Sequence, residues 1–134
     1  MRRWVLLLTL ALSLAASPAW AMTVTVDGVT ATVTADEPTA NVPNADGVVT
    51  PLDDLAATEF RYDVGAGPVV CATAPATVPT GGGTVSADCA VPVRDREVKV
   101  AIFTAVAVDT SGNRSAPSDP VSVRLDRLPP DRPR

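Results

Sequence analysis

Apolar and polar residues alternate along most of this chain, and the alternation has a period of two. The alternating runs cover residues 23–26, 29–35, 59–64, 84–91, 98–108 and 121–125. Clusters of Gly, Pro, Asn and Asp separate these runs, as turns separate short strands. No window of twelve residues has the 3.6-residue apolar spacing of a helix, although 51–60 is compatible with one helical turn. The pattern predicts an all-β fold, a sandwich or a barrel, with almost no helix.

Composition strengthens this prediction. From residue 22 onward the chain has twenty valines against four leucines and one isoleucine, and branching at Cβ favours the pleated sheet. The same segment has only three aromatic residues, Phe60, Tyr62 and Phe103. We therefore expect a core built mainly from small aliphatic side chains.

The first 21 residues have the layout of a signal peptide. Arg2 and Arg3 precede an apolar run at 4–16, and small residues follow at Ala19 and Ala21. The thirteen residues of that run are too few for a bilayer-spanning helix, which needs about 20. We expect cleavage after Ala21 and a secreted or periplasmic protein with no membrane span after cleavage. A retained membrane anchor is the alternative.

The segment 22–134 has the length of one domain. It carries nine lysines and arginines against fifteen aspartates and glutamates, a net charge of −6, which argues against nucleic acid as a partner. Its last part, 127–134, is rich in Pro and Arg. We expect a folded domain at 22–126 followed by a disordered tail.

Cys71 and Cys89 are the two cysteines of the chain. An even pair in an exported protein indicates a disulfide. The alternatives are a redox pair or two metal ligands, but the spacing is not C-x-x-C and the chain has no histidine to complete a zinc site. Closing the seventeen-residue loop between them removes unfolded-state entropy worth about 3 kcal/mol in the chain-entropy model.

Catalytic motifs are lacking, and we expect no enzymatic activity. Without histidine the Ser-His-Asp, Cys-His and most metallohydrolase schemes are excluded. The carboxylate pairs Asp53 with Asp54 and Asp63 with Glu59 remain as acid–base candidates, but acidic loop residues are more often solvated. Lys99 has no serine partner motif. The glycines at 81–83 lack the Lys-Ser/Thr and helix of a phosphate loop.

Acidic residues in the expected loops raise the alternative of calcium binding, because hard cations prefer oxygen ligands. These residues are Asp27, Asp46, Asp53, Asp54 and Asp109. They do not have EF-hand or nonapeptide spacing, and turn capping explains them equally well. We therefore predict no metal or other cofactor.

Two separated segments resemble fibronectin type III domains of bacterial proteins. The residues "AVDTSGN" at 107–113, followed by "SAPS" and a valine strand, resemble the F strand, FG turn and G strand of that family. Upstream, 38–65 resembles its B-to-C region, with a Pro, Asn and Asp-Gly loop before "TPL" and an aromatic C strand. The resemblance implies a fibronectin type III-like, immunoglobulin-like antiparallel sandwich of about seven strands.

The chain departs from this family at two core positions. A Trp is usual near the end of strand B and a Tyr on strand F, and Ala35 or a neighbour and Ala101 stand there instead. Each large aromatic buries about 150–250 Å², so their loss removes several kcal/mol of expected burial. We expect the Cys71–Cys89 bridge to compensate.

Both faces of the 98–108 run are apolar. Phe103 and its flanking alanines form one face, which the resemblance places inside the sandwich. Ile102, Val106 and Val108 belong to the other face, and an exposed apolar row usually marks an interface. We expect these three residues to contact a partner or a second copy. The alternatives are that Arg61 and Arg124 cover the row with their stems, or that the two faces are reversed.

These observations favour an exported, non-catalytic binding or adhesion module. Its partner would be an unknown protein or polysaccharide, recognised through loops or the outer sheet face. The alternative is a self-associating structural subunit of an envelope or extracellular assembly, which would be a homo-oligomer.

Overall fold

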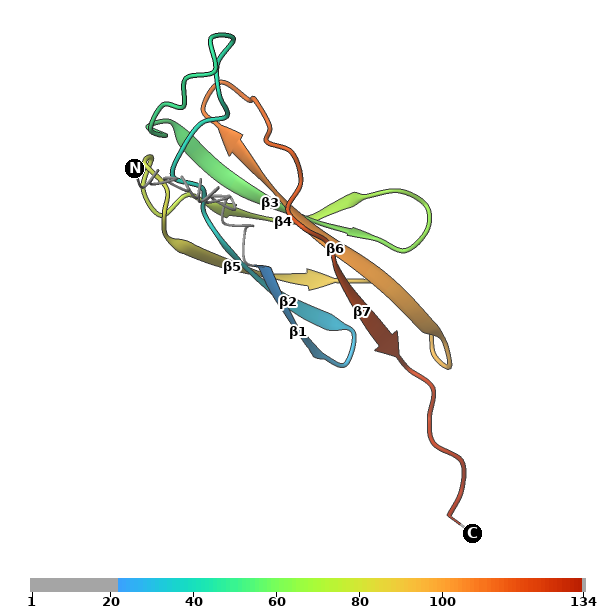
Figure 1. Ribbon diagram of the computed structural model, residues 1–134. Helices are drawn as coiled ribbons and strands as arrows, with labels where there is room; N and C mark the ends of the chain where they lie inside the picture. Colours follow the sequence, from blue (N-terminus) through green and yellow to red (C-terminus); the bar gives the residue numbers. More distant parts are fainter. Residues whose placement is uncertain (1–21, 134) are drawn as a thin grey trace, which may run out of the picture.

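The fold, taken from a computed structural model, is described for residues 22–133 and consists of seven β-strands (Figure 1). The strands are β1 (Met22–Asp27), β2 (Thr30–Asp36), β3 (Leu55–Asp63), β4 (Val69–Pro75), β5 (Thr84–Ala90), β6 (Val98–Asp109) and β7 (Val121–Asp126). No helix occurs in 22–133, so no helix there is long and apolar enough to cross a membrane. The predicted all-β class is confirmed, and the helical turn considered at 51–60 is wrong because β3 occupies most of that segment.

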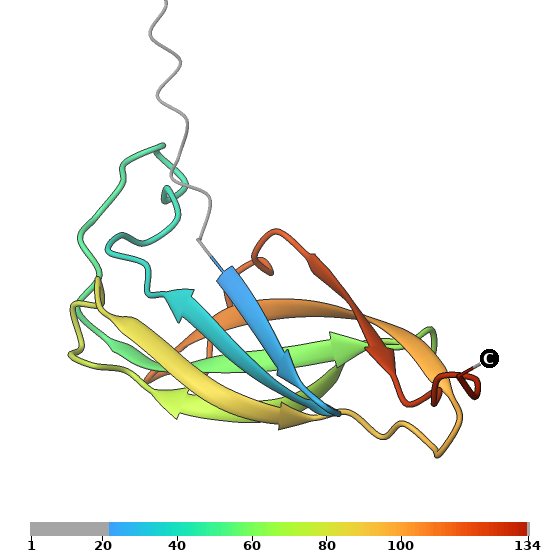
Figure 2. The ribbon, with the colours of Figure 1, turned by 90° about the horizontal axis from the view of Figure 1, so that it is seen from below.

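The strands form two antiparallel sheets that face each other (Figure 2). One sheet has the order β1-β2-β5 and the other the order β4-β3-β6-β7. The short connection between β1 and β2 contains Gly28, whose φ is 62°. Glycine adopts a positive φ without a steric penalty, so the chain can reverse there without strain. The two-layer arrangement buries the inward side of each sheet.

Small side chains fill the space between the sheets, as composition predicted. Phe60, Phe103 and Leu125 are its largest buried residues. Ala35 and Ala101, the small residues that the sequence placed in the core, are fully buried. The expected inward face of β6 is therefore confirmed at Phe103.

The predicted Cys71–Cys89 disulfide is confirmed. Cys71 lies on β4 and Cys89 on β5, which are edge strands of different sheets. The bridge therefore joins the two layers along one side of the sandwich. In the unfolded chain, where the sheets are absent, the bridge keeps Cys71 and Cys89 close together and so lowers the entropy of the unfolded state.

Strand β4 has no counterpart among the alternating runs of the sequence. The strand starts with two adjacent valines, Val69 and Val70, and its register with β3 then shifts between Phe60 and Arg61, which leaves Cys71 without a partner on β3. A bulge of this kind breaks the period-two pattern. Pattern reasoning therefore misses the strand.

Residues 127–133 follow β7 without regular structure and extend away from the sandwich (Figure 1). Arg127 is the anchor of this segment. Its backbone N–H donates to the Glu97 carbonyl at 2.9 Å, and its guanidinium donates to the Val93 carbonyl at 3.0 Å. The predicted signal peptide and its cleavage point after Ala21 lie outside the described residues.

Candidate functional site

Two long loops meet at one end of the sandwich. The 37–54 loop joins β2 to β3, and the 110–120 loop joins β6 to β7. Both are tied down by local hydrogen bonds. The geometry of this end therefore follows from turn chemistry in each loop.

Asp109 organises the start of the 110–120 loop. Its Oδ1 accepts the backbone N–H groups of Ser111 and Asn113 at 2.9 and 2.8 Å, and its Oδ2 accepts the Asn113 amide at 2.8 Å. The side-chain bond from Asn113 is the main cause of a lowered pKa for Asp109. Gly112 supplies the positive φ of 83°. The predicted turn at this hairpin is confirmed. Both oxygens of the Asp109 carboxylate accept hydrogen bonds from residues of this turn.

The rest of the 110–120 loop runs beside β6 in place of a strand. Ser115 N–H donates to the Ala107 carbonyl at 3.0 Å and Ser118 N–H to the Ala105 carbonyl at 2.8 Å. In return, the hydroxyl oxygens of Ser115 and Ser118 accept the N–H groups of Ala107 and Ala105. Serine side chains thus complete the ladder that an irregular backbone leaves open.

The 37–54 loop closes on itself through two asparagines. Asn41 N–H donates to the Thr50 carbonyl at 2.9 Å, and the Asn41 amide donates to the Thr50 hydroxyl at 3.1 Å. The side-chain oxygen of Asn44 accepts the N–H groups of Asp46 and Val48, both at 3.0 Å. Asparagine suits this role because its short amide bonds to nearby backbone.

A buried carboxylate fixes the base of the same loop. Glu37 is 5% exposed and accepts the Thr77 N–H at 2.8 Å, the Thr77 hydroxyl and the Gly83 N–H. Nearby, Gly81 packs so closely on Pro38 that a Cβ there would lie 1.9 Å from the Pro38 carbonyl oxygen. The 76–83 segment therefore holds the start of the 37–54 loop in place, through bonds to Glu37 and contact with Pro38.

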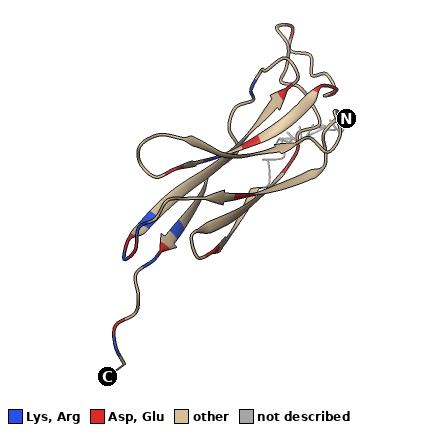
Figure 3. Ribbon diagram, turned by 180° about the vertical axis from the view of Figure 1, so that it is seen from behind, with Lys and Arg blue, Asp and Glu red and all other residues tan. Residues whose placement is uncertain are grey.

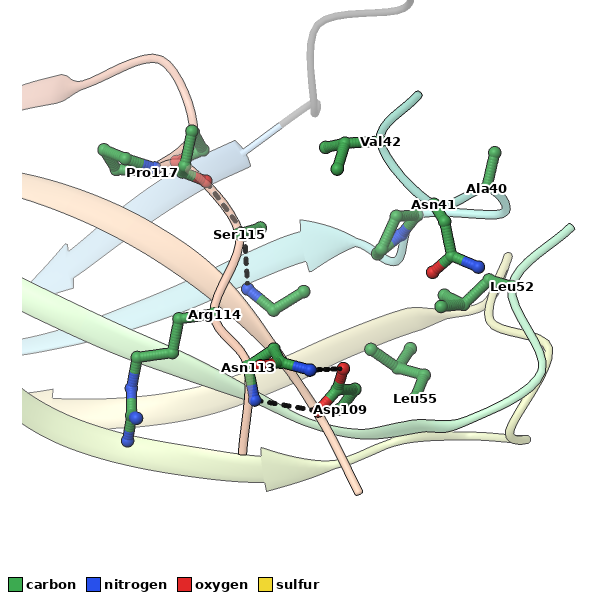
Figure 4. Close-up of a pocket in the computed structure, with 14 residues that line it drawn as sticks. Ala40, Asn41, Val42, Leu52, Leu55, Asp109, Asn113, Arg114, Ser115 and Pro117 are labelled. Atoms are coloured by element: carbon green, nitrogen blue, oxygen red, sulfur yellow. Dashed lines mark hydrogen bonds between the residues drawn. The ribbon is translucent and has the colours of Figure 1, made fainter. Parts of the chain in front are cut away.

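A pocket of about 530 Å³ lies between the two loops (Figure 4). Residues 40–42 stand on one side and residues 113–117 on the other, with Leu52 and Leu55 between them. The apolar residues of its lining are Pro38, Ala40, Val42, Leu52, Leu55, Ala107, Ala116 and Pro117. This volume falls within the range of small-ligand sites.

The polar residues of the lining already have partners within the chain. Asp109 and Asn113 bond to each other, and Asn41 donates to Thr50 and to the Pro51 carbonyl. The serines complete the β6 ladder. A ligand therefore meets a surface that offers mainly apolar contact and few free hydrogen-bonding groups.

Val42 is the exposed large hydrophobic residue of the pocket lining. Its side chain is 78% exposed, although it lines the opening. Exposure of a valine to this extent leaves apolar area that a ligand can cover. The alternation of apolar and polar residues does not predict this pocket, because the residues that line it come mostly from loops that do not alternate.

The outer face of β6 differs from the sequence prediction at Val106. Val106 is 1% exposed and Val108 is half-buried, whereas Ile102 is 44% exposed. Val98 and Val100 continue the accessible row at 36% and 55%. The expectation that Val106 is an accessible member of the row is wrong.

An ion-paired cluster explains the burial of Val106. Glu59 lies opposite Val106 on β3, and Arg114 lies across β6 on its other side, bridged to Val108. The Arg114 and Arg61 guanidinium groups reach Glu59 at 2.9 and 2.8 Å. The Arg114–Glu59 pair must therefore cross β6 over Val106.

The same cluster sets the electrostatics of this face. Hydrogen bonds from Arg114, then from Arg61, lower the pKa of Glu59 below its ordinary value of 4.5. The pairing raises the pKa of Arg114. The two arginines that the alternative expected to cover the row are both in ion pairs, Arg61 with Glu59 at 2.8 Å and Arg124 with Asp126 at 3.1 Å.

In one of the carboxylate pairs considered for catalysis, Asp63 with Glu59, both members are bonded to other groups. Glu59 is held by two arginines, and Asp63 Oδ1 accepts the N–H groups of Gly65 and Gly67 in a turn. Lys99 is paired with Glu97 at 3.1 Å. Within 22–133, no group of three acidic or cysteine side chains is placed to hold a metal ion.

In comparisons with known proteins, no family model, curated protein or solved structure matches this chain. Inference about function therefore depends on the geometry of the chain itself.

Proposed function

We propose that this chain is an exported, non-catalytic binding module of fibronectin type III-like fold that binds an apolar segment of another protein in the loop pocket. The observation that carries the proposal is the pocket lining. It combines exposed apolar residues, Ala40, Val42, Ala116 and Pro117, with the buried Leu52, Leu55 and Ala107, and its polar side chains are already bonded within the chain. Loops held on a rigid scaffold are a common way to present a binding site.

A protein ligand is favoured over a polysaccharide. Sugar hydroxyl groups need free donors and acceptors, and a buried hydroxyl without one costs about 1–3 kcal/mol. The Asp109 carboxylate is committed to its own turn, and the Ser115 hydroxyl bonds to Ala107 and Ala116. Aliphatic or proline side chains can enter the pocket without that cost.

Three observations support export and the fold assignment. Seven antiparallel strands in sheets of three and four are compatible with the sandwich architecture of fibronectin type III domains. The Cys71–Cys89 disulfide suits an oxidising compartment. The signal-peptide pattern of residues 1–21 would direct the chain there.

The test is affinity capture with the oxidised protein immobilised and the native exported fraction passed over it. Val42→Lys should abolish retention of the ligand protein, because it places a charge at the apolar opening. Val69→Lys is the matched control. Val69 is also an exposed valine, but it lies away from the pocket. It pairs with Tyr62 near the end of β3, whereas the pocket is lined by Leu55 at the start of that strand. Retention that survives Val42→Lys would contradict the proposal.

The accessible row on β6 favours a second candidate, self-association as a structural subunit. Val98, Val100 and Ile102 are contiguous on one face and exposed. Ile102→Lys separates the two functions. Loss of self-association with ligand capture intact would identify this face as the interface between copies.

A further inference from the structure

Charge is distributed unevenly between the two ends of the molecule (Figure 3). The pocket end carries a group of carboxylates at Asp46, Asp53, Asp54, Asp109 and Asp119. Within the two loops, 37–54 and 110–120, Arg114 is the only cation, and it is paired with Glu59 at 2.9 Å. The pocket therefore lies in a region of unbalanced negative charge, which attracts a basic ligand.

The segment after β7 has the complementary properties. Residues 127–134 contain three arginines against one aspartate. Leu128 is 57% exposed, and Pro129 and Pro130 beside it are also exposed. The segment thus combines an apolar group of three residues with net positive charge.

Three prolines, Pro129, Pro130 and Pro133, reduce the entropy lost when this segment is immobilised. Proline restricts φ before binding, and an extended proline-containing peptide is partly ordered in advance. In a polyproline conformation the six residues 128–133 span about 19 Å. That length is enough to place Leu128 in a pocket and Arg132 on its acidic rim.

The segment cannot reach the pocket of its own molecule. Arg127 is bonded to Glu97, next to the first residue of β6, whereas the pocket is lined by Ala107 near its end. The strand between these points is about 30 Å long at 3.3 Å per residue. Pro130 is only three residues from the anchor, a reach of about 10 Å.

We propose that the loop pocket binds residues 128–133 of a second copy of this chain. Leu128, Pro129 and Pro130 contact the apolar lining, and Arg132 lies among the carboxylates of the rim. This inference rests on the proposed function of the same pocket as a peptide-binding site. The partner in this case is a second copy of the same chain.

The contact joins unlike surfaces, the pocket of one copy and the segment after β7 of the next. Such a heterologous contact does not close on itself unless the rotation forms a ring. It therefore builds a linear chain of molecules. Because a short peptide buries less than a standard interface, we expect a dissociation constant on the order of 0.1 mM.

The test uses the full oxidised protein in sedimentation velocity between about 10 µM and 1 mM. Wild-type protein should show species larger than dimers as concentration rises, and the association should weaken with salt. The pocket variant Val42→Lys and the double tail variant Leu128→Ser with Arg132→Glu should each remain monomeric. Val69→Lys should associate as the wild type does.

Mixing the two defective variants tests the head-to-tail geometry. The tail variant retains an intact pocket, and the pocket variant retains an intact tail, so an equimolar mixture should form dimers and nothing larger. Circular dichroism checks that both variants are folded, which their exposed positions lead us to expect.

A monomeric wild-type protein at 1 mM, or association that neither variant weakens, would overturn the inference. The proposed function has a separate readout. Capture of another exported protein that is lost in Val42→Lys and retained in the tail variant would support the binding module while refuting a second copy as its ligand.

Discussion

The hydroxyl of Thr58 provides a sharp test of the core. Thr58 is fully buried on β3, and its Oγ1 has no hydrogen-bond partner. Its cross-strand neighbours are Ala74 and Ala107, which offer no side-chain acceptor. A buried hydroxyl without a partner costs about 1–3 kcal/mol relative to water.

Replacing Thr58 by valine removes this cost and keeps the branched shape at Cβ. We expect Thr58→Val to raise the free energy of unfolding by about 1–2 kcal/mol. In urea, with a slope of about 1.5 kcal/mol per molar for a domain of this size, the midpoint should rise by about 1 M.

Thr73→Val is the matched control, because Thr73 lies on the adjacent strand β4 and is exposed. It should change stability by less than about 0.5 kcal/mol. A midpoint that falls in Thr58→Val, while the control is unchanged, would refute the reasoning. That result would mean that the Thr58 hydroxyl is bonded in solution.

Three further predictions concern the loops, the ion-paired cluster and the disulfide. Gly81→Ala should destabilise the fold by at least about 2 kcal/mol in urea, since its φ is 67° and its Cβ would meet the Pro38 carbonyl. Gly47→Ala, at φ 77° in open space, should cost about half as much. The pKa of Glu59 is lowered mainly by Arg114, so its stabilisation is present above pH 4.5 and is lost as pH falls further. Urea midpoints from pH 6 to 3 should fall less steeply in Glu59→Gln. Reducing the disulfide should lower stability by about 3 kcal/mol, measured by urea unfolding with and without reductant. Three results would contradict these expectations: equal losses of stability in Gly81→Ala and Gly47→Ala, the same pH dependence of the urea midpoint in Glu59→Gln and wild type, or an unchanged urea midpoint after reduction of the disulfide.

Strands that alternate could be predicted from the sequence, and β6 is the clearest case. Every second residue from Ala101 to Ala107 faces the core, as the period-two pattern requires. Strand β4 could not be predicted in the same way, because its bulge against β3 leaves Cys71 without a partner on β3 and interrupts the period-two pattern of the strand. Local disruption of the ladder hides a strand that tertiary pairing nevertheless forms.

The disulfide was predictable from cysteine count and compartment, whereas the burial of Val106 was not. Alternation assigns Val106 to the outer face, and that assignment is correct. Its exposure depends on Arg114, which reaches across β6 to Glu59 from a loop that comes later in the chain. Side-chain coverage of this kind depends on tertiary geometry, which a pattern of residue types does not contain.

The pocket was not predictable for a related reason. Its two walls are more than sixty residues apart in sequence, and each wall is shaped by asparagine, aspartate and serine side chains that bond to nearby backbone. In the sequence those residues indicate turns and nothing more.

Their internal bonds also determine what the pocket can recognise. Because Asp109, Asn41 and Ser115 are committed to the loops that they shape, the remaining contact surface is apolar. Apolar contact alone is weakly directional. Orientation of a ligand must then come from the charge of the rim, where Asp46, Asp53 and Asp119 are exposed. A site of this kind should therefore prefer an extended segment that carries an apolar group followed by a cation.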